Sequence, residues 1–235
     1  MSIASSNQHY KVGVLVFPGA DILDFAGPME VLSHVSHNRN PDRPDRMFDI
    51  CTIARRSSIL SAGSLTVAAD LLLDEALAQI ADFDILVVPG GFPAVLQPLT
   101  DNNAPELEII RQFAALPPQT SQKQRVLFSV CTGAFLVGAT GILSGITVTT
   151  HHQGLDALGK ICAQAQGPEV PPVNIVHKRC VDGGYLKGGG VRIITAGGIS
   201  SGLDATFHLV RLLANNETAL FVARLMEYDW SESKV

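Results

Sequence analysis

The cysteine at position 131 stands where a strand-like run meets a helix-like one. Residues 126–130 are a mainly apolar Val-Leu-Phe-Ser-Val run, and the small residues Thr132, Gly133 and Ala134 follow the cysteine. A cysteine in such a tight turn projects from the sheet edge with helix N–H groups behind it. This placement predicts a lowered thiol pKa and a thiolate able to attack an electrophilic carbon. A buried structural cysteine is the alternative, because free cysteine is among the most buried residue types.

Glycine pairs follow two other strand-like runs. Gly90-Gly91 comes after residues 84–88, and Gly197-Gly198 after residues 191–195. Glycine lets the backbone approach a ligand closely, and its N–H group can help to form an anion hole. The carboxyl ends of parallel strands form the ligand site of an open α/β sheet. We therefore expect both glycine pairs to lie near Cys131.

Alternating strands and helices are expected to position these residues. The predicted strands cover 11–17, 48–53, 84–88, 126–130, 146–150 and 191–195, and the predicted helices cover 22–34, 72–81, 105–115, 134–143, 155–160, 203–213 and 217–226. Such alternation with uniformly apolar strands predicts an α/β fold with a doubly wound, mainly parallel sheet and helices on both faces. We expect a single domain over residues 11–228, with a flexible lead at 1–10 and a tail at 229–235.

Composition excludes several classes of function. Of the 235 residues 46% are hydrophobic and 17% charged, and the net charge is −5, which argues against nucleic acid as a partner. No apolar run is long enough to span a membrane, and residues 1–9 lack the pattern of a signal peptide. The cysteines show neither CxxC pairs nor zinc spacing, so we expect reduced thiols, a cytoplasmic location and no metal site. They are Cys51, Cys131, Cys162 and Cys180.

Five motifs in chain order resemble those of the ThiJ/PfpI superfamily. They are Phe17-Pro18 to Leu23-Asp24-Phe25-Ala26-Gly27-Pro28, then Val88-Pro89-Gly90-Gly91, Ser129-Val130-Cys131-Thr132-Gly133, Thr149-Thr150-His151 and Thr195 to Asp204. The resemblance runs from about residue 12 to residue 213. It implies the class-I glutamine amidotransferase-like fold, which is flavodoxin-like. Within the superfamily, the forms around Asp24 and Cys131 most resemble those of isocyanide hydratases and of the ligand domains of AraC-type regulators.

The resemblance implies roles for two residues. Cys131 matches the superfamily's nucleophile, and Asp24 matches the acidic residue that contacts this cysteine in isocyanide hydratases. A protonated Asp24 would donate to the thiolate, and an ionised Asp24 would act as a proton shuttle. The alternative for Asp24 is a helix cap, for which Asp21 competes.

Four further residues complete the expected site. Thr132 follows the nucleophile and takes the place of the histidine found in the protease-like branch; its hydroxyl is expected to bond substrate or Asp24. Gly90 and Gly91 are expected to contribute N–H groups to an oxyanion hole. His151 matches a histidine that lies near the cysteine in several superfamily members.

The function implied by the resemblance is cofactor-independent hydration of isocyanides to N-formamides through a covalent thioimidate on Cys131, a lyase reaction. The expected partner is a small-molecule substrate, and the expected assembly is a homodimer. Two alternatives remain open: a glyoxalase-like hydration of methylglyoxal, and a non-enzymatic ligand- or redox-sensing domain.

Overall fold

A seven-stranded sheet forms the centre of the computed structural model, which describes residues 8–101, 103–119, 123–167 and 169–231. The strand order is β10-β11-β7-β6-β1-β2-β5, and every neighbouring pair is parallel except β10–β11. The strands are β1 (Tyr10–Leu15), β2 (Phe48–Ala54), β5 (Leu71–Leu72), β6 (Ile85–Val88), β7 (Arg125–Ser129), β10 (Cys180–Tyr185) and β11 (Val191–Ala196). All residues of the central strands β6 and β7 are buried, as expected of parallel strands covered on both faces.

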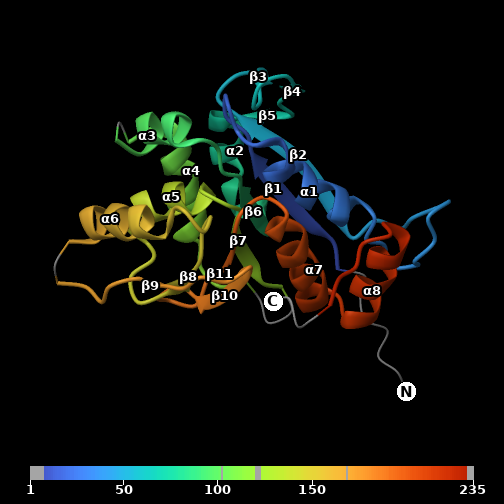
Figure 1. Ribbon diagram of the computed structural model, residues 1–235. Coiled ribbons are helices and arrows are strands. Elements are labelled where there is room, and N and C mark those ends of the chain that lie inside the picture. The colour runs from blue at the N-terminus through green and yellow to red at the C-terminus, as the bar shows by residue number, and fades with distance from the viewer. Residues whose placement is uncertain (1–7, 102, 120–122, 168, 232–235) are drawn as a thin grey trace.

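Helices cover both faces of this sheet (Figure 1). One face carries α1 (Ile22–Ser33), α7 (Ser201–Leu213) and α8 (Asn216–Leu225), which pack on one another in that order. The other carries α2 (Leu73–Ala78), the 3₁₀ turn η1 (Ile80–Asp82), α3 (Pro93–Asp101), α4 (Pro105–Ala114), α5 (Gly133–Ala139) and α6 (Leu155–Gln166). The predicted doubly wound α/β fold is therefore confirmed.

Two small sheets lie outside the main one. The strands β3 (Ser58–Leu60) and β4 (Thr66–Ala68) form an antiparallel hairpin. Ala62, between the two strands, donates its N–H to Ala20 O just before α1 begins. The pair β8 (Thr147–Val148) and β9 (Asn174–Ile175) is parallel and leads into residues 149–152.

Several element boundaries differ from the sequence expectation. The predicted helix over 72–81 is split, because Leu71–Leu72 pair with β2 before α2 begins. The helix predicted over 134–143 ends at Ala139, close to Gly141, whose φ is +79°. Helix α3 and strand β10 were not predicted: α3 contains Pro98, and β10 contains two glycines and a register shift between Asp182 and Gly184.

The expected lead and tail are ordered in part. Tyr10 is the first residue of β1, and Trp230, within the expected tail, is 6% exposed and packs its ring on Phe207. Residues 1–7 and 232–235 lie outside the described residues. None of the helices in the described ranges is long and apolar enough to cross a membrane.

Candidate active site

Cys131 occupies a strained turn between β7 and α5. Its φ is +56°, a left-handed conformation that is uncommon for residues other than glycine and that clusters at functional sites. The turn is held by its N–H group, which donates to Ala196 O and Gly197 O at 3.1 and 3.0 Å, and by Thr150 Oγ1, which donates to Cys131 O at 2.8 Å. The end of β11 and the segment after β8 therefore fix the direction of the thiol. This is the geometry that the sequence predicted for residue 131.

Gly133 lets α5 begin against the end of β6. A Cβ atom at this position would lie 2.2 Å from Val88 O and 2.8 Å from Pro89 O, and these backbone atoms cannot move aside as a side chain would. The turn at Cys131 therefore depends on a residue without a side chain two positions later.

Replacing Gly133 by alanine is expected to destabilise the fold by about 3 kcal/mol or more, because the new Cβ overlaps backbone atoms. The matched change Gly159→Ala lies inside α6, where the Cβ would meet only Ile175 Cδ1 at an ordinary 3.5 Å. It should stabilise the protein by roughly 0.5–1 kcal/mol through helix propensity. Urea unfolding of both variants checks this; equal midpoints would contradict the steric argument.

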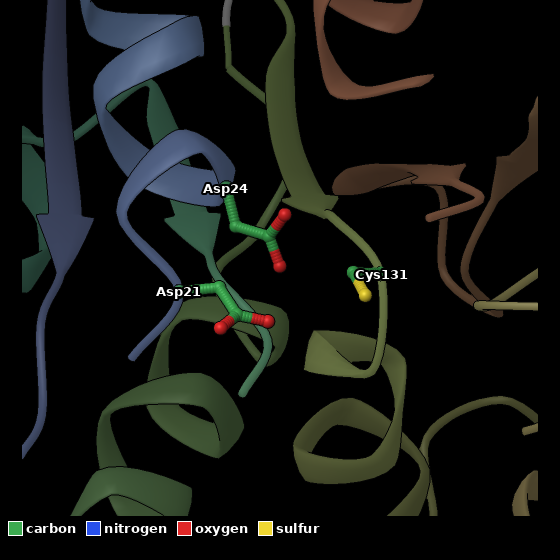
Figure 2. A group of neighbouring side chains, drawn as sticks. All are labelled: Asp21, Asp24 and Cys131. Carbon is green, nitrogen blue, oxygen red and sulfur yellow. The ribbon is translucent and has the colours of Figure 1, made fainter. Parts of the chain in front are cut away.

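Asp24 lies in the first turn of α1 with its carboxyl group directed toward Cys131 (Figure 2). The side chain is fully buried, and its Oδ2 accepts a hydrogen bond from Gly90 N–H at 3.0 Å. Its Oδ1 has no hydrogen-bond partner among the described residues. Burial is the main cause that raises the pKa of Asp24 to about 7, and the charge of Asp21 adds to it, although the Gly90 N–H opposes. Asp24 therefore changes protonation state near neutral pH.

The two glycines of residues 90–91 hold side chains in place. Gly90 N–H binds Asp24, and Gly91 N–H donates to Thr132 Oγ1 at 3.0 Å. Thr132 Oγ1 in turn donates to Gly91 O at 2.7 Å. The Thr132 hydroxyl thus bonds the backbone of residue 91, where the sequence suggested substrate or Asp24. Neither glycine N–H is directed to an open position, so both are engaged in the resting protein instead of forming a free oxyanion hole.

The N–H groups beside the cysteine sulfur are those of Thr132 and Ile199, and both act to lower the thiol pKa. Burial acts in the opposite direction and dominates, and the neighbouring Asp24 carboxylate adds to it, so that the pKa of Cys131 is raised to about 11. The expectation of a lowered thiol pKa is therefore wrong: the side chain is 3% exposed, and its nearest charge is negative. Ile199 lies within the motif Thr195 to Asp204, but its N–H group was not among the site groups that the sequence predicted.

Asp21 also belongs to this cluster, although its position before α1 predicted only a possible helix cap. It occupies the N-cap position of α1, yet its side chain makes no capping hydrogen bond. Its carboxylate, that of Asp24 and the Cys131 sulfur all lie within 4.8 Å of one another (Figure 2). In the described ranges, these three residues are the only group of three or more His, Cys, Asp or Glu side chains whose spacing could hold a metal ion. The three-residue spacing of the two aspartates at a helix start was the available signal.

His151 approaches the site from the segment after β8. Its charge interacts with that of Asp21, its ring lies 4.3 Å from the ring of His152, and it packs on Gly198, where a Cβ atom would fall 2.5 Å from His151 Cδ2. Burial lowers the pKa of His151, and the charge of His152 lowers it further. Because Asp21 is the cluster residue with which the charge of His151 interacts, His151 lies on the Asp21 side of the cluster.

A cavity of about 470 Å³ opens beside this cluster. It is lined by residues 150–152, 177–179 and 197–201, which include three histidines and Lys178. Two of its lining residues contact Cys131: Gly197 O accepts the Cys131 N–H, and the N–H group of Ile199 faces the sulfur. Cys131, Asp24 and Asp21 are not among its lining residues, so the cavity adjoins the cluster through Gly197 and Ile199.

Curated relatives resemble this chain over most of its length. Isonitrile hydratase from Pseudomonas putida is 30% identical over 223 residues, covering 93% of this chain and 78% of that protein. An uncharacterized protein in the cpoL 5′ region of Streptomyces lividans is 34% identical over 153 residues, covering 65% of this chain and 95% of that protein.

Solved structures share the fold. A ThiJ/PfpI family protein from Pseudomonas syringae superposes with a TM-score of 0.71 at 21% identity, covering 95% of this chain and 76% of that one. An AraC family transcriptional regulator from Pseudomonas putida gives 0.68 at 19% identity, covering 92% and 99%. The model of the DJ-1/PfpI family matches residues 10–186, a range that contains all six site residues expected from the sequence. The chain therefore belongs to the DJ-1/PfpI family.

Proposed function

We propose that the protein hydrates isocyanides to N-formamides, with Cys131 as nucleophile and Asp24 as proton donor. The observation that carries this proposal is the buried Asp24 carboxyl group facing the thiol, with a pKa of about 7. Similarity to the Pseudomonas putida protein named isonitrile hydratase supports it.

Isocyanide chemistry suits this arrangement because both new bonds form at the same atom. The terminal carbon of R–N≡C accepts the sulfur and then a proton, so nucleophile and acid must stand on the same side of it. A carboxylate oxygen of Asp24 lies within 4.8 Å of the Cys131 sulfur, close enough for both groups to act on one carbon. No oxyanion develops in this step, which fits the engagement of the Gly90 and Gly91 N–H groups.

The first half of the reaction transfers one proton and forms one bond. The pKa is raised to about 7 for Asp24 and to about 11 for Cys131, so at a pH between these values the pair holds a single proton. Sulfur attacks the isocyanide carbon, and the proton of the pair moves to that carbon, which gives the thioimidate R–N=CH–S–Cys131. Asp24 is then ionised.

The second half consumes one water. Water adds to the thioimidate carbon, one of its protons goes to the nitrogen, and the carbon–sulfur bond breaks to release R–NH–CHO. The other proton returns to the Cys131–Asp24 pair. The R group would occupy the cavity lined by His151, His177 and Lys178, a polar lining that favours substituents with hydrogen-bond acceptors.

Incubation of the purified protein with p-nitrophenyl isocyanide is expected to yield the formamide, measured by liquid chromatography, at a rate far above that of Cys131→Ala. Methylglyoxal in a parallel reaction, followed as lactate, tests the glyoxalase-like alternative. Formamide production no faster than that of Cys131→Ala would refute the proposal.

A further inference from the structure

The site contains a second carboxylate that the scheme above does not use. Asp21 lies one helical turn before Asp24 on the same side of α1, and both acids face the cysteine (Figure 2). The two differ in their access to water: Asp24 is fully buried, whereas Asp21 is half-buried. Asp21 also makes no capping hydrogen bond, so its N-cap position does not account for it.

Hydrolysis of the thioimidate requires a base as well as an acid. Water is a weak nucleophile, and a positioned base that removes its proton contributes roughly 10²–10⁴-fold to such a step. After the first half-reaction Asp24 is ionised, but it is sealed from solvent and its Oδ2 is engaged by Gly90 N–H. The incoming water must approach from the accessible side, where Asp21 lies.

Distances at the cluster fit this role. An oxygen of Asp21 lies within 4.8 Å of the Cys131 sulfur. A general base acts at roughly 2.6–3.2 Å from the oxygen it deprotonates. A water bound to Asp21 at that distance can therefore face a carbon that is bonded to the sulfur.

The surroundings of the two acids differ in burial and in neighbouring charge. Burial raises the pKa of Asp21, and the charge of His151 opposes that rise, whereas the charge of Asp21 adds to the burial that raises the pKa of Asp24 to about 7. Two carboxyl groups whose environments separate their pKa values are suited to serve as acid and base.

We propose that Asp21 is the general base that activates water in the second half-reaction. The proposal rests on the proposed isocyanide hydration. Asp21 accepts one proton from water as the oxygen bonds to the thioimidate carbon, and then passes that proton to the nitrogen. The hydroxyl proton leaves on collapse of the adduct and returns to the Cys131–Asp24 pair, so that thiol and formamide are the only products.

The variant Asp21→Asn separates the two half-reactions. We expect its kcat to fall by about 10²–10⁴-fold, since only the base is lost. The rate at which Cys131 is labelled in a single turnover should stay within a few-fold of the wild type. A covalent adduct with the mass of one isocyanide should therefore accumulate on Cys131, as measured by mass spectrometry of the acid-quenched protein.

Three controls accompany this measurement. Asp24→Asn should form little adduct, because it lacks the acid of the first step. Asp74→Asn, at an exposed acidic residue in the first turn of α2, should behave as the wild type. Hydroxylamine, a nucleophile that needs no deprotonation, should release the adduct of Asp21→Asn as the N-hydroxyformamidine and restore turnover.

The outcomes distinguish the two proposals. Absence of formamide from the wild type overturns isocyanide hydration and the role of Asp21 with it. If the wild type produces formamide, two results would show that Asp21 is not the base. In one, Asp21→Asn keeps the kcat of the wild type. In the other, the labelling of Cys131 in Asp21→Asn slows as much as its overall turnover does. Asp21→Ser is a second variant; unfolding of both in circular dichroism would assign Asp21 a structural role instead.

Discussion

Replacing Cys131 by alanine is expected to lower the rate of formamide production by about 10⁴-fold or more, because no other group can form the covalent intermediate. The fold should persist: the turn at residue 131 is held by backbone bonds to residues 196 and 197 and by the Thr150 hydroxyl, none of which involves the sulfur. Formamide production and thermal unfolding, measured on the same preparation, check both statements.

The control for this variant is Cys162→Ala. Cys162 is also fully buried; it lies in α6, packs on Gly138 of α5, and is not part of the cluster with the aspartates. Removing its sulfur should reduce stability by about 1 kcal/mol through the small cavity left behind, with activity retained. A residual rate in Cys131→Ala close to that of Cys162→Ala would show that the thiol at residue 131 is not the nucleophile.

Asp24→Asn is expected to lower kcat/KM by about 10²–10⁴-fold and, at the same time, to make the protein more stable above pH 7. Burial raises the pKa of Asp24 in the folded protein from 3.8 to about 7. An acid with a raised pKa binds its proton more tightly in the folded state, so ionisation destabilises the fold as the pH rises from about 4 to about 7. The amide avoids this loss and keeps an oxygen to accept the Gly90 N–H.

The size of the stability difference depends on pH in a defined direction. At pH 3 and below the two proteins should unfold alike, because Asp24, with a pKa of 3.8 in the unfolded chain, is largely protonated in both states. At pH 8 the variant should be more stable by roughly 2–4 kcal/mol. Urea unfolding at the two pH values measures it, and Asp74→Asn serves as the exposed control. A variant that is less stable at pH 8 would mean that the Asp24 carboxylate has structural bonds beyond the one to Gly90.

The pH profile of activity tests the same residue. The reactive form of the Cys131–Asp24 pair holds one proton, so kcat/KM in the wild type should rise with pH through about 7. In Asp24→Asn this limb should move to higher pH, because only the buried thiol remains to titrate. A limb near 7 in both proteins would exclude Asp24 as its source.

The sequence alone was sufficient for the architecture and for the turn at Cys131. Apolar runs such as residues 126–130 fit only strands covered on both faces, and their alternation with helical segments leaves few topologies. Local sequence patterns were less informative where a neighbouring strand decides whether a segment becomes a strand. Leu71–Leu72 became a strand because β2 pairs with them, and β10 formed across Gly183 and Gly184 because β11 lies beside it.

The electrostatics of the site were decided by tertiary structure. The thiol of Cys131 was expected to be acidic from its position before α5, yet burial and the Asp24 carboxylate raise its pKa. The carboxylate comes from α1, which is about a hundred residues earlier in the chain. Desolvation depends on everything packed around the sulfur.

What the sequence by itself determined is therefore which residues meet at the candidate site: a cysteine at a strand–helix turn, an aspartate in the motif around residues 23–28, and glycines at a strand end. Only the tertiary structure decided how they act. It engaged the N–H groups of Gly90 and Gly91, brought Asp21 beside Asp24, and placed Ile199 at the sulfur. Residue types are local properties, whereas pKa values and hydrogen-bond partners depend on contacts between segments that are distant in the chain.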